Sequence, residues 1–301
     1  MNIETAVIPV AGAGSREFPV TTAIEKCMMP VYAGPESRPL VDYMVEDCVL
    51  AGLSRVIFVT SERGEQQLRD YFGQDISPTI RQQLLRVGKT DKIDQEIERR
   101  RAYGIEFEYV IQPPDNYGTA IPPFLARERL QGEKHFALMG GDDFVYHQNG
   151  TSELSLAIAD WKEKGTEHAI MGLPVDREQA TKYGNLLVDQ YGNLGAFDEK
   201  PPLERIAEHP VANISRYLLS GSIWEHIDAE MQRNRGLAEH YVTFAIQSAL
   251  AADQSFYVHR VLGKYLDGGS FEGLLEASNY ITTHPRFAEW PTPELITASV
   301  S

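Results

Sequence analysis

Apolar residues along this chain alternate between short continuous runs and helically spaced positions, which is the pattern of an α/β protein. Residues 5–10 and 55–60 form apolar runs typical of strands that are buried on both faces of a parallel sheet. Between them, apolar residues recur at helical spacing from Leu40 to Cys48, and we expect that helix to end near Gly52. The N-terminal part therefore predicts a strand, a helix and a second, parallel strand.

The alternation continues through the rest of the chain. Residues 62–103 are rich in Gln, Arg, Glu and Asp with apolar residues at helical intervals, which predicts two exposed helices. Strands are expected at 106–112, 135–139, 168–173, 214–219 and 256–262. Helices are expected from Pro122 or Pro123 onward, and at 154–164, 241–252 and 271–281.

One segment departs from this pattern. Residues 185–189 and 193–198 are two short strand-like runs joined by a Gln-Tyr-Gly turn, which predicts a β-hairpin laid over the α/β core. Hairpins at such positions often cover ligands. We therefore expect a Rossmann-like α/β fold: a mixed, mainly parallel sheet with helices on both faces and a small β-hairpin region. The simplest division is one domain over residues 1–285, followed by a loosely held C-terminal tail over 286–301.

Composition narrows the possible partners. The chain has 301 residues, of which 43% are hydrophobic, and this suits one sizeable core. Its 28 Lys and Arg against 43 Asp and Glu give a net charge of −15, which repels nucleic acid and anionic membranes. A phosphate ligand would therefore need local cations and backbone donors. Two cysteines and a start that lacks signal-peptide features predict a cytoplasmic protein, and the apolar stretches are shorter than the roughly 20 residues that cross a bilayer.

The first candidate for chemistry is the glycine-rich segment after the first strand. It reads Ala11-Gly12-Ala13-Gly14-Ser15-Arg16 and is followed by Lys26. A GxG segment alone also serves ordinary turns. The segment lacks the third glycine of a dinucleotide-binding motif and the GKS or GKT ending of a P-loop. What remains is a loop of accessible backbone N–H groups with two cations, spaced to reach different oxygens of a triphosphate.

The longer run GAGSREFPVTTAIEKCMMPV resembles the signature of the sugar-phosphate nucleotidylyltransferases. The nearest likeness is to the bacterial UTP:glucose-1-phosphate uridylyltransferases, and it extends from Thr5 to about Ile281. The resemblance implies that Ala11, Gly12 and Gly14 wrap the nucleotide. It also implies that Arg16 and Lys26 grip the phosphates as the catalytic residues.

Further segments match the family in order. In the run Gln112-Pro-Pro-Asp-Asn-Tyr-Gly118, the resemblance implies that Gln112 and Gly118 recognise the base. An amide can pair with a pyrimidine edge, and a glycine lets the base approach the backbone. Alone, this run would be an ordinary loop.

Two aspartates match the metal-binding positions of the family. Asp142 follows an apolar strand, at the sheet edge where open α/β folds bind ligands, and Asp267 lies in the run Gly-Lys-Tyr-Leu-Asp-Gly-Gly. The resemblance implies that they share one Mg²⁺, a hard cation that prefers oxygen ligands. Asp143 is expected to be a neighbour that adjusts the local charge or caps the turn.

A third pair of segments corresponds to the sugar-binding part of the family. The resemblance implies that Gly184, Glu199 and Lys200 bind the sugar phosphate, with the glutamate accepting hydroxyls and the lysine neutralising the phosphate. A Glu-Lys-Pro run alone is an ordinary surface turn.

The implied reaction needs no side-chain nucleophile, since the phosphate of a hexose 1-phosphate attacks the α-phosphorus of a nucleoside triphosphate and pyrophosphate leaves. Cys27 is accordingly expected to be a buried or half-buried thiol. UTP and glucose 1-phosphate are the first choice of substrates. Several positions depart from the uridylyltransferase pattern and leave the nucleotide and the sugar open: Thr22, Glu25, Cys27, Ser215 and Phe244.

Two other classes of function stay open. A regulatory paralogue would be expected to lose Arg16, Lys26, Asp142 or Asp267, and all four are present. A nucleotide-binding oxidoreductase is disfavoured by the missing third glycine. The resemblance further implies a homodimer or homotetramer, for which the predicted C-terminal helix offers the apolar residues Phe271, Leu274 and Leu275.

Overall fold

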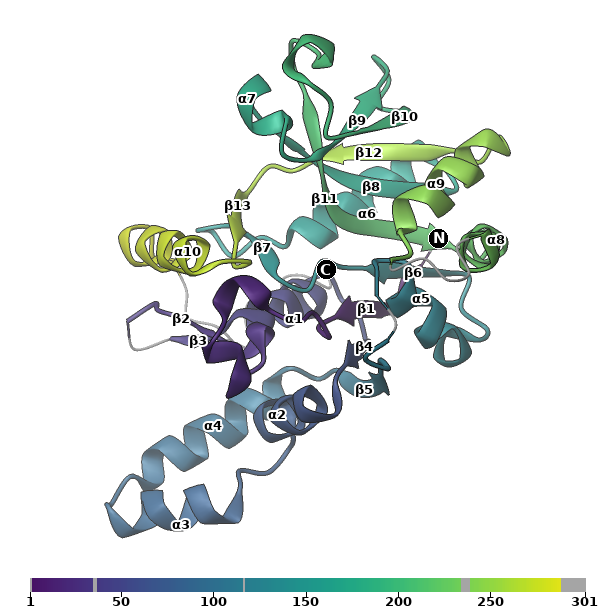
Figure 1. Cartoon of the computed structure of the whole chain (residues 1–301). Coiled ribbons are helices and arrows are strands. Elements are labelled where there is room, and N and C mark those ends of the chain that lie inside the picture. The colour runs from purple at the N-terminus through teal and green to yellow at the C-terminus, as the bar shows by residue number, and fades with distance from the viewer. Residues whose placement is uncertain (1, 35–36, 116, 234–238, 288–301) are drawn as a thin grey trace.

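A single mixed sheet forms the centre of the computed structural model, which describes residues 2–34, 37–115, 117–233 and 239–287 (Figure 1). Its strands lie in the order β10-β9-β11-β6-β1-β4-β5, with β8 paired to β11 and β12 paired to β8. The strands of this sheet are β1 (Thr5–Pro9), β4 (Arg55–Thr60), β5 (Glu106–Ile111), β6 (His135–Leu138), β8 (His168–Pro174), β9 (Gly184–Val188), β10 (Leu194–Glu199), β11 (Val211–Ser220) and β12 (Phe256–Arg260).

Strands β6, β1, β4 and β5 run parallel to one another, as their continuous apolar runs predict. Strand β11 runs antiparallel to both β6 and β8 and so extends the sheet toward the hairpin β9–β10. The predicted α/β fold with a mixed sheet and a hairpin region is therefore confirmed.

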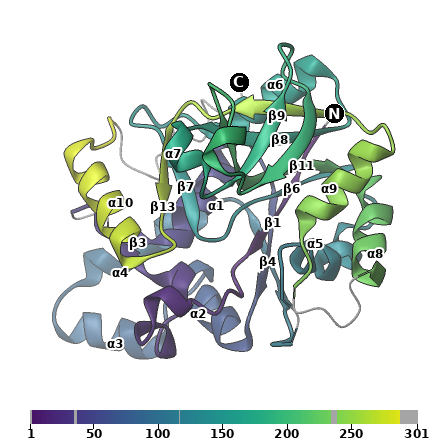
Figure 2. The same ribbon diagram turned by 45° about the horizontal axis from the view of Figure 1, so that its top comes forward.

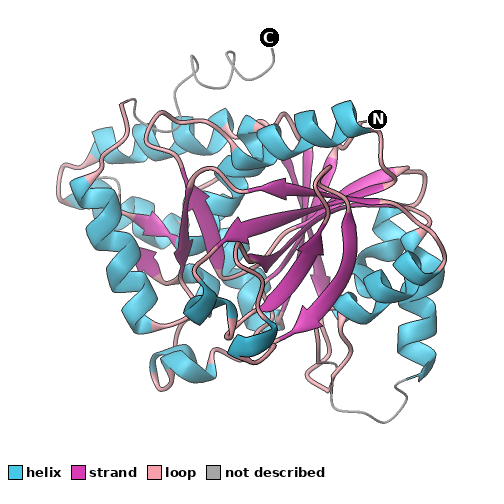
Figure 3. Ribbon diagram, turned by 90° about the horizontal axis from the view of Figure 1, so that it is seen from above, coloured by secondary structure: helices cyan, strands magenta, loops and turns pink. Residues whose placement is uncertain are grey.

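Helices cover both faces of the sheet because successive side chains of the central strands point to opposite sides (Figure 3). Ile8 of β1 packs into one apolar cluster and Val7 into the other. The first cluster includes residues of α1 (Leu40–Leu50), α2 (Glu62–Phe72), α6 (Glu153–Lys164) and α10 (Phe271–Thr283). The second includes residues of α5 (Ile121–Ala126), α8 (Ile223–Arg233) and α9 (Val242–Ala251).

Two small strand pairs lie outside the main sheet. Strand β7 (Asp143–Tyr146) pairs antiparallel with β13 (Lys264–Asp267), in the register that sets Asp143 opposite Asp267. Strands β2 (Pro30–Val31) and β3 (Arg38–Pro39) form the other pair. In Figures 1 and 2, α10 lies beside β13, and α8 and α9 lie at the other side of the molecule.

The prediction of two helices over residues 62–103 is wrong, because three helices form there. They are α2, α3 (Pro78–Arg86) and α4 (Thr90–Ala102), and the last two extend away from the sheet in Figure 1. Pro78 is the first residue of α3. Gly88, with a φ of 71°, interrupts the helical conformation between α3 and α4. The polar composition of residues 62–103 gave no clear sign of where one helix ends and the next begins.

Other elements have no counterpart in the predictions. They are α7 (Arg177–Ala180), helix α8 and the short strands β2, β3, β7 and β13. The predicted tail, 286–301, lies outside the described residues from 288 onward. Within the described ranges, no helix combines the length and apolar character needed to cross a bilayer.

The carboxyl ends of β1, β4, β5 and β6 meet at one edge of the sheet. There the N–H of Val10 donates to Val59, that of Gln112 to Thr60 and that of Met139 to Val7. The glycine loop, the Gln112 segment and the Asp142 turn therefore leave the sheet side by side.

Candidate active site

A cavity of about 400 Å³ lies at this edge of the sheet. The predicted site residues that line it are Ala11, Gly12, Gly14, Lys26, Gln112, Gly118 and Asp142. The first and last of these residues, Ala11 and Asp142, are 131 positions apart in the sequence. The fold thus brings together the phosphate-binding, base-binding and metal-binding candidates.

The glycine loop forms one wall of the cavity. Gly14 has a φ of 57°, a left-handed conformation that favours glycine, and a Cβ atom there would lie 2.5 Å from Thr21. A Cβ atom on Gly12 would instead meet nothing within 4 Å. Packing within the protein therefore explains Gly14, whereas Gly12 leaves open space for a ligand to approach the backbone.

Gly118 also lines the cavity and is required by the protein's own backbone. Its φ is 112°, and a Cβ atom would come within 2.0 Å of the carbonyl oxygen of His240. The N–H of Ala120 donates to that carbonyl, and the N–H of His240 donates to Tyr117. The absent side chain thus lets the segment that precedes α9 close over the Gln112 loop.

The two predicted catalytic cations meet at Asp142. The Nζ atom of Lys26 lies 2.7 Å from Oδ2 of Asp142, and Nη2 of Arg16 lies 3.8 Å from the same oxygen. Lys26 is largely buried at the start of a short 3₁₀ helix, Lys26–Met28, whereas the Arg16 side chain is 61% exposed. The site therefore presents one fixed ammonium and one guanidinium that can move toward a phosphate.

The two predicted metal ligands face a common point. A Cβ atom on Gly269 would lie 2.7 Å from Oδ1 of Asp267, 3.1 Å from Oδ2 of Asp142 and 2.7 Å from Nη2 of Arg16. The N–H of Gly269 also donates to Oδ1 of Asp267 at 2.7 Å, which orients that carboxylate. Glycine at this position leaves the space between the carboxylates open.

This pair of carboxylates fits Mg²⁺. The ion prefers hard oxygen ligands and is commonly held by one or two carboxylates, with waters and substrate phosphates completing its shell. Among residues 2–34, 37–115, 117–233 and 239–287, no group of three or more His, Cys, Asp or Glu side chains is arranged to hold a metal. Asp142 and Asp267 would therefore need the oxygens of a bound phosphate as further ligands.

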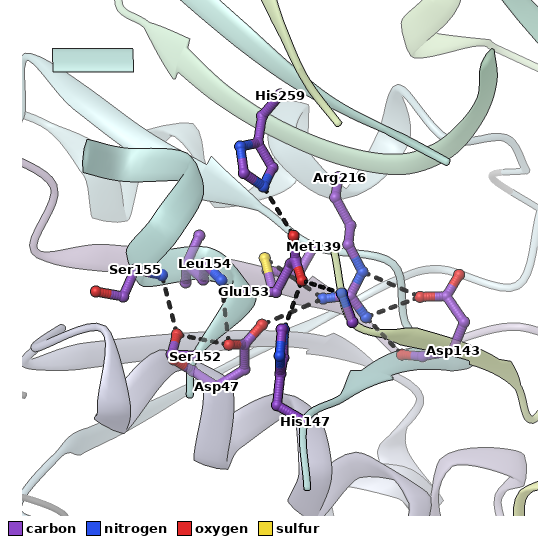
Figure 4. Close-up of polar contacts among 11 residues, drawn as sticks. Asp47, Met139, Asp143, His147, Ser152, Glu153, Leu154, Ser155, Arg216 and His259 are labelled. Carbon is purple, nitrogen blue, oxygen red and sulfur yellow. Dashed lines mark hydrogen bonds and ion pairs between the residues drawn. The ribbon is translucent and has the colours of Figure 1, made fainter. Parts of the chain in front are cut away.

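A buried arginine holds the Asp142 turn in place (Figure 4). Nη2 of Arg216 donates to Oδ1 of Asp143 at 2.8 Å and to its backbone oxygen at 2.6 Å. Nη1 lies 3.8 Å from Asp47, whose carboxylate accepts a hydrogen bond from Ser152 at 2.6 Å. Tyr265 of β13 donates to the other oxygen of Asp143. Burial raises the pKa of Asp143 to about 6, although the charge of Arg216 opposes the shift.

A second buried network connects the two strands that carry Asp143 and Asp267. Glu153, at the first position of α6, accepts hydrogen bonds from the N–H groups of Leu262 and Gly263, both at 2.9 Å. Its carboxylate also contacts His259 at 2.8 Å and His147 at 2.6 Å (Figure 4). Since His147 follows β7 and Gly263 precedes β13, Glu153 joins these two strands at the end opposite their aspartates.

The predicted sugar-binding residues lie together on the hairpin, outside the lining of the cavity. Glu199 pairs with Gly184 across β9 and β10, and a Cβ atom on Gly184 would lie 2.9 Å from Oε2 of Glu199. Lys200 follows with a φ of 42°. Burial first, and then the carboxylates of Asp267 and Asp143, raise the pKa of the adjacent Tyr183. The chain just before the hairpin therefore lies near the metal-binding candidates.

This arrangement has known counterparts. Residues 5–284 match the family described as Nucleotidyl transferase. The chain belongs to the nucleotidyl transferase family. It is therefore a nucleotidyltransferase, and its open cation and carboxylate site is the candidate place of transfer.

Similar proteins cover nearly the whole length of this nucleotidyl transferase. The UTP–glucose-1-phosphate uridylyltransferase of Pseudomonas aeruginosa is 32% identical over 285 residues, which is 92% of this chain and 95% of that protein. The enzyme of the same name from Bacillus subtilis is 30% identical over 294 residues, covering 95% and 91%.

Two solved structures have the same fold as this nucleotidyl transferase. The UTP-bound UGPase from Acinetobacter baumannii has a TM-score of 0.81 and 26% identity over 94% of this chain and 95% of that one. A UDP-glucose pyrophosphorylase in complex with UDP-glucose has a TM-score of 0.74 and 28% identity over 94% and 99%.

Residues that depart from the uridylyltransferase pattern have defined places in this nucleotidyl transferase. Cys27 is buried, as expected, and Ser215 lines the cavity with a φ of 56°, in the region that favours glycine. Glu25 accepts hydrogen bonds from Ser61 and Arg63 and so ties the residue before Lys26 to the start of α2. Phe244 lies outside the cavity lining and is 40% exposed, with the Arg233 guanidinium 4.8 Å from its ring.

Several lining residues were absent from the predictions. Tyr217 enters from β11, and Glu239, Tyr241 and Val242 enter from the segment before α9. The N–H of Val242 donates to Thr119, which attaches this segment to the Gln112 loop. Tyr217 lies in the strand expected at 214–219, without a local signal that its side chain reaches the cavity. The sequence carries no local signal that residues 239–242 fold back over the loop.

Proposed function

We propose that this nucleotidyltransferase joins UTP to glucose 1-phosphate and releases UDP-glucose and pyrophosphate. The observation that carries the proposal is the meeting of Arg16, Lys26 and Asp142 beside Asp267, at a cavity that Lys26 and Asp142 line together with Gln112 and Gly118. Relatives that are 30–32% identical over more than nine-tenths of the chain bear the name of this activity and support the choice of substrates.

The reaction is a direct displacement. A phosphate oxygen of glucose 1-phosphate attacks the α-phosphorus of UTP, and the bond from that phosphorus to the bridging oxygen of the β-phosphate breaks. Pyrophosphate leaves with the electron pair of that bond. The attacking phosphate is already an anion, so no side chain has to remove a proton.

The residues act by positioning and by neutralising charge. Lys26 is held close to the cavity and can donate to the nucleotide phosphates, while the exposed Arg16 can close over them. Asp142 and Asp267 would hold Mg²⁺, which when bound offsets the charge of the two substrates' phosphates. A local set of cations is required because the chain carries a net charge of −15.

The uracil base and the glucose ring would be recognised away from the residues that bind the phosphates and the metal. Gln112 has an amide that can pair with the edge of uracil, and Gly118 lines the same cavity. Glu199 can accept hydrogen bonds from glucose hydroxyls, with Lys200 beside it to neutralise the sugar phosphate. This assignment requires the hairpin to face the cavity when the sugar is bound.

The experiment is a substrate panel with the purified protein. UTP, dTTP, CTP, GTP and ATP are each combined with glucose, galactose and mannose 1-phosphates, and pyrophosphate release is measured with and without Mg²⁺. We expect UTP with glucose 1-phosphate to react at least about tenfold faster than any other pair, in keeping with specific base and sugar contacts. Mass spectrometry should identify UDP-glucose. No release with any pair would reject the proposal, and a different best pair would reject its choice of substrates.

Three wider properties belong to the same proposal. We place the enzyme in the cytoplasm, since its two cysteines are both free and buried. We treat residues 1–285 as one catalytic domain. We also expect a homodimer or homotetramer: Leu274 is buried in the protein's own core, but Phe271 and Leu275 of α10 are exposed and available for contact. Light scattering that shows only monomer at micromolar concentration would contradict the expected assembly.

A further inference from the structure

Glu17 is a buried carboxylate directly after the glycine loop. It ends the short 3₁₀ helix Ser15–Glu17, directly after Arg16, and its side chain is 0% exposed. Neither of its carboxylate oxygens has a hydrogen-bond partner among the described residues. The charged group beside it is the ammonium of Lys26, with Nζ 3.7 Å from Oε1.

Burying such a carboxylate destabilises the folded state unless a nearby positive charge compensates it. Removing an ion from water costs several kcal/mol, and here no hydrogen bond offsets the loss. The nearby ammonium of Lys26 is itself largely buried and supplies the opposite charge. Glu17 and Lys26 therefore depend on each other.

Lys26 lies between two carboxylates that differ in access. Asp142 is closer, at 2.7 Å, and its side chain is 41% exposed beside Asp267 and Arg16. Glu17 is more distant and closed to solvent. A metal ion that enters from the cavity can therefore reach Asp142 but not Glu17. The metal and the ammonium would compete for the same oxygen, Oδ2 of Asp142.

We propose that Glu17 is a positioning residue for Lys26. It is the fixed counter-ion that holds the ammonium in the cavity wall when the metal takes Asp142, so that Lys26 stays aimed at the nucleotide phosphates. The inference rests on the proposed function, since it takes Asp142 as a metal ligand and Lys26 as a phosphate ligand. It adds a residue that no part of the family resemblance assigns.

The proposal makes the effect of Glu17 conditional on Lys26. Without the Glu17 charge, Lys26 keeps Asp142 as its partner and competes more strongly with the metal. The metal should then bind more weakly, and turnover should fall. If Lys26 is replaced first, nothing remains for Glu17 to position. The same change at Glu17 should then alter neither quantity.

A double-mutant cycle tests this dependence. The variants are Glu17→Gln, Glu17→Met, Lys26→Met and the two doubles. Glu17→Met is included because an apolar side chain of similar size at a buried charged position is often tolerated without loss of stability. Binding of Mn²⁺ alone is followed through the electron paramagnetic resonance signal of the free ion, and turnover is measured with UTP and glucose 1-phosphate.

We expect both Glu17 variants to raise the half-saturating Mn²⁺ concentration about fivefold and to lower kcat about tenfold, each equivalent to about 1 kcal/mol or slightly more. In the Lys26→Met background both quantities should change less than twofold. Lys26→Met alone should lower the urea midpoint because it strands the Glu17 charge, and the Glu17→Met double should restore it.

Equal effects of the Glu17 change in both backgrounds would overturn the inference, and so would no effect in either. The two proposals fail in different ways. A protein that makes no UDP-glucose but shows the expected Mn²⁺ and urea results keeps the Glu17–Lys26 pairing and loses the proposed function. A protein that makes UDP-glucose but shows additive changes loses only the inference.

Discussion

Nη2 of Arg216 lies 2.8 Å from Oδ1 of Asp143, and both side chains are buried. The pair stands directly behind the metal-binding candidates, since Asp143 follows Asp142 in sequence and faces Asp267 across β7 and β13. Because Arg216 also contacts Asp47 of α1, one guanidinium connects β11, the Asp142 turn and a helix of the core. The position of the candidate metal-binding carboxylates is thus set by a buried charge.

Arg216→Met should therefore destabilise the fold strongly. It leaves two buried carboxylates without their cation, and breaking a buried pair in this way costs about 3 to 5 kcal/mol. Arg205→Met is the matched control, because Arg205 pairs with Asp198 on the surface, with a side chain that is 61% exposed, and such pairs contribute at most about 1 kcal/mol. Urea unfolding of both variants measures the difference. Equal losses would show that the buried pair has no special weight.

Activity should depend on a divalent cation held by Asp142 and Asp267. Asp142→Asn and Asp267→Asn should each weaken metal binding and cost several kcal/mol of transition-state stabilisation, since the ion offsets charge that the nearby side chains cannot carry alone. Asp94→Asn, at an exposed position of α4, is the control and should leave activity unchanged. Assays across a range of Mg²⁺ concentrations and with added chelator check this. Full turnover in chelator would remove the metal from the account.

Stability should vary with pH through His259 and Glu153. Burial lowers the pKa of His259, but its hydrogen bonds with Glu153 and Asp160 outweigh that effect and raise the pKa above the usual 6.5. Burial raises the pKa of Glu153, but its bonds with His147 and His259 lower it below the usual 4.5. The His259 contribution is present below pH 6.5 and is lost as pH rises through the raised pKa. The Glu153 contribution is present above pH 4.5 and is lost as pH falls.

His259→Gln tests the predicted loss of the His259 contribution to stability as the pH rises. Protonated His259 donates to both carboxylates, and hydrogen bonds to charged groups contribute about 1.5 to 3 kcal/mol each. The variant should therefore lose most stability, relative to the parent, near pH 6. The difference should shrink near pH 9, where neutral His259 has a single N–H for two carboxylates. Urea unfolding at both pH values gives the answer, and a difference that grows with pH would show that His259 is neutral in the fold.

Cys27 should not act as a nucleophile. Burial first, and then the charge of Glu25, raise the pKa of its thiol, so that the reactive thiolate is not formed near neutral pH. Cys27→Ser should keep at least about a tenth of the activity, since the displacement needs no covalent intermediate. Mass spectrometry of the enzyme mixed with UTP alone should find the unmodified chain. A uridylyl adduct on Cys27 would contradict the direct displacement.

The glycine loop and the carboxylates of the candidate site could be proposed from the sequence because each is signalled locally. A glycine pattern follows an apolar strand, and an aspartate stands at the end of another. The partners of Arg216, in contrast, could not be predicted from the sequence. Arg216 is a charged residue within β11, and its partners Asp47 and Asp143 are defined only when α1 and β7 pack against that strand.

Glu17 and the segment at 239–242 were missed for similar reasons. A glutamate after Arg16 has the pattern of a solvated loop residue, and its burial follows from how the loop folds over Lys26. Tyr241 and Val242 reach the cavity through the hydrogen bonds of His240 and Val242 with the loop at 117–120. Long-range contacts of this kind leave no periodic pattern in the sequence.

The central claim is that the Lys26 ammonium works on transferring phosphate in an enzyme that makes UDP-glucose. Its most direct test is steady-state formation of UDP-glucose by folded Lys26→Ala protein, beside the parent and the exposed control Lys92→Ala. A positioned cation in such a site contributes about 3 to 4 kcal/mol, so turnover of Lys26→Ala should fall by roughly 10² to 10³ while Lys92→Ala matches the parent. Turnover of Lys26→Ala within twofold of the parent would contradict the account at the contact on which it depends most.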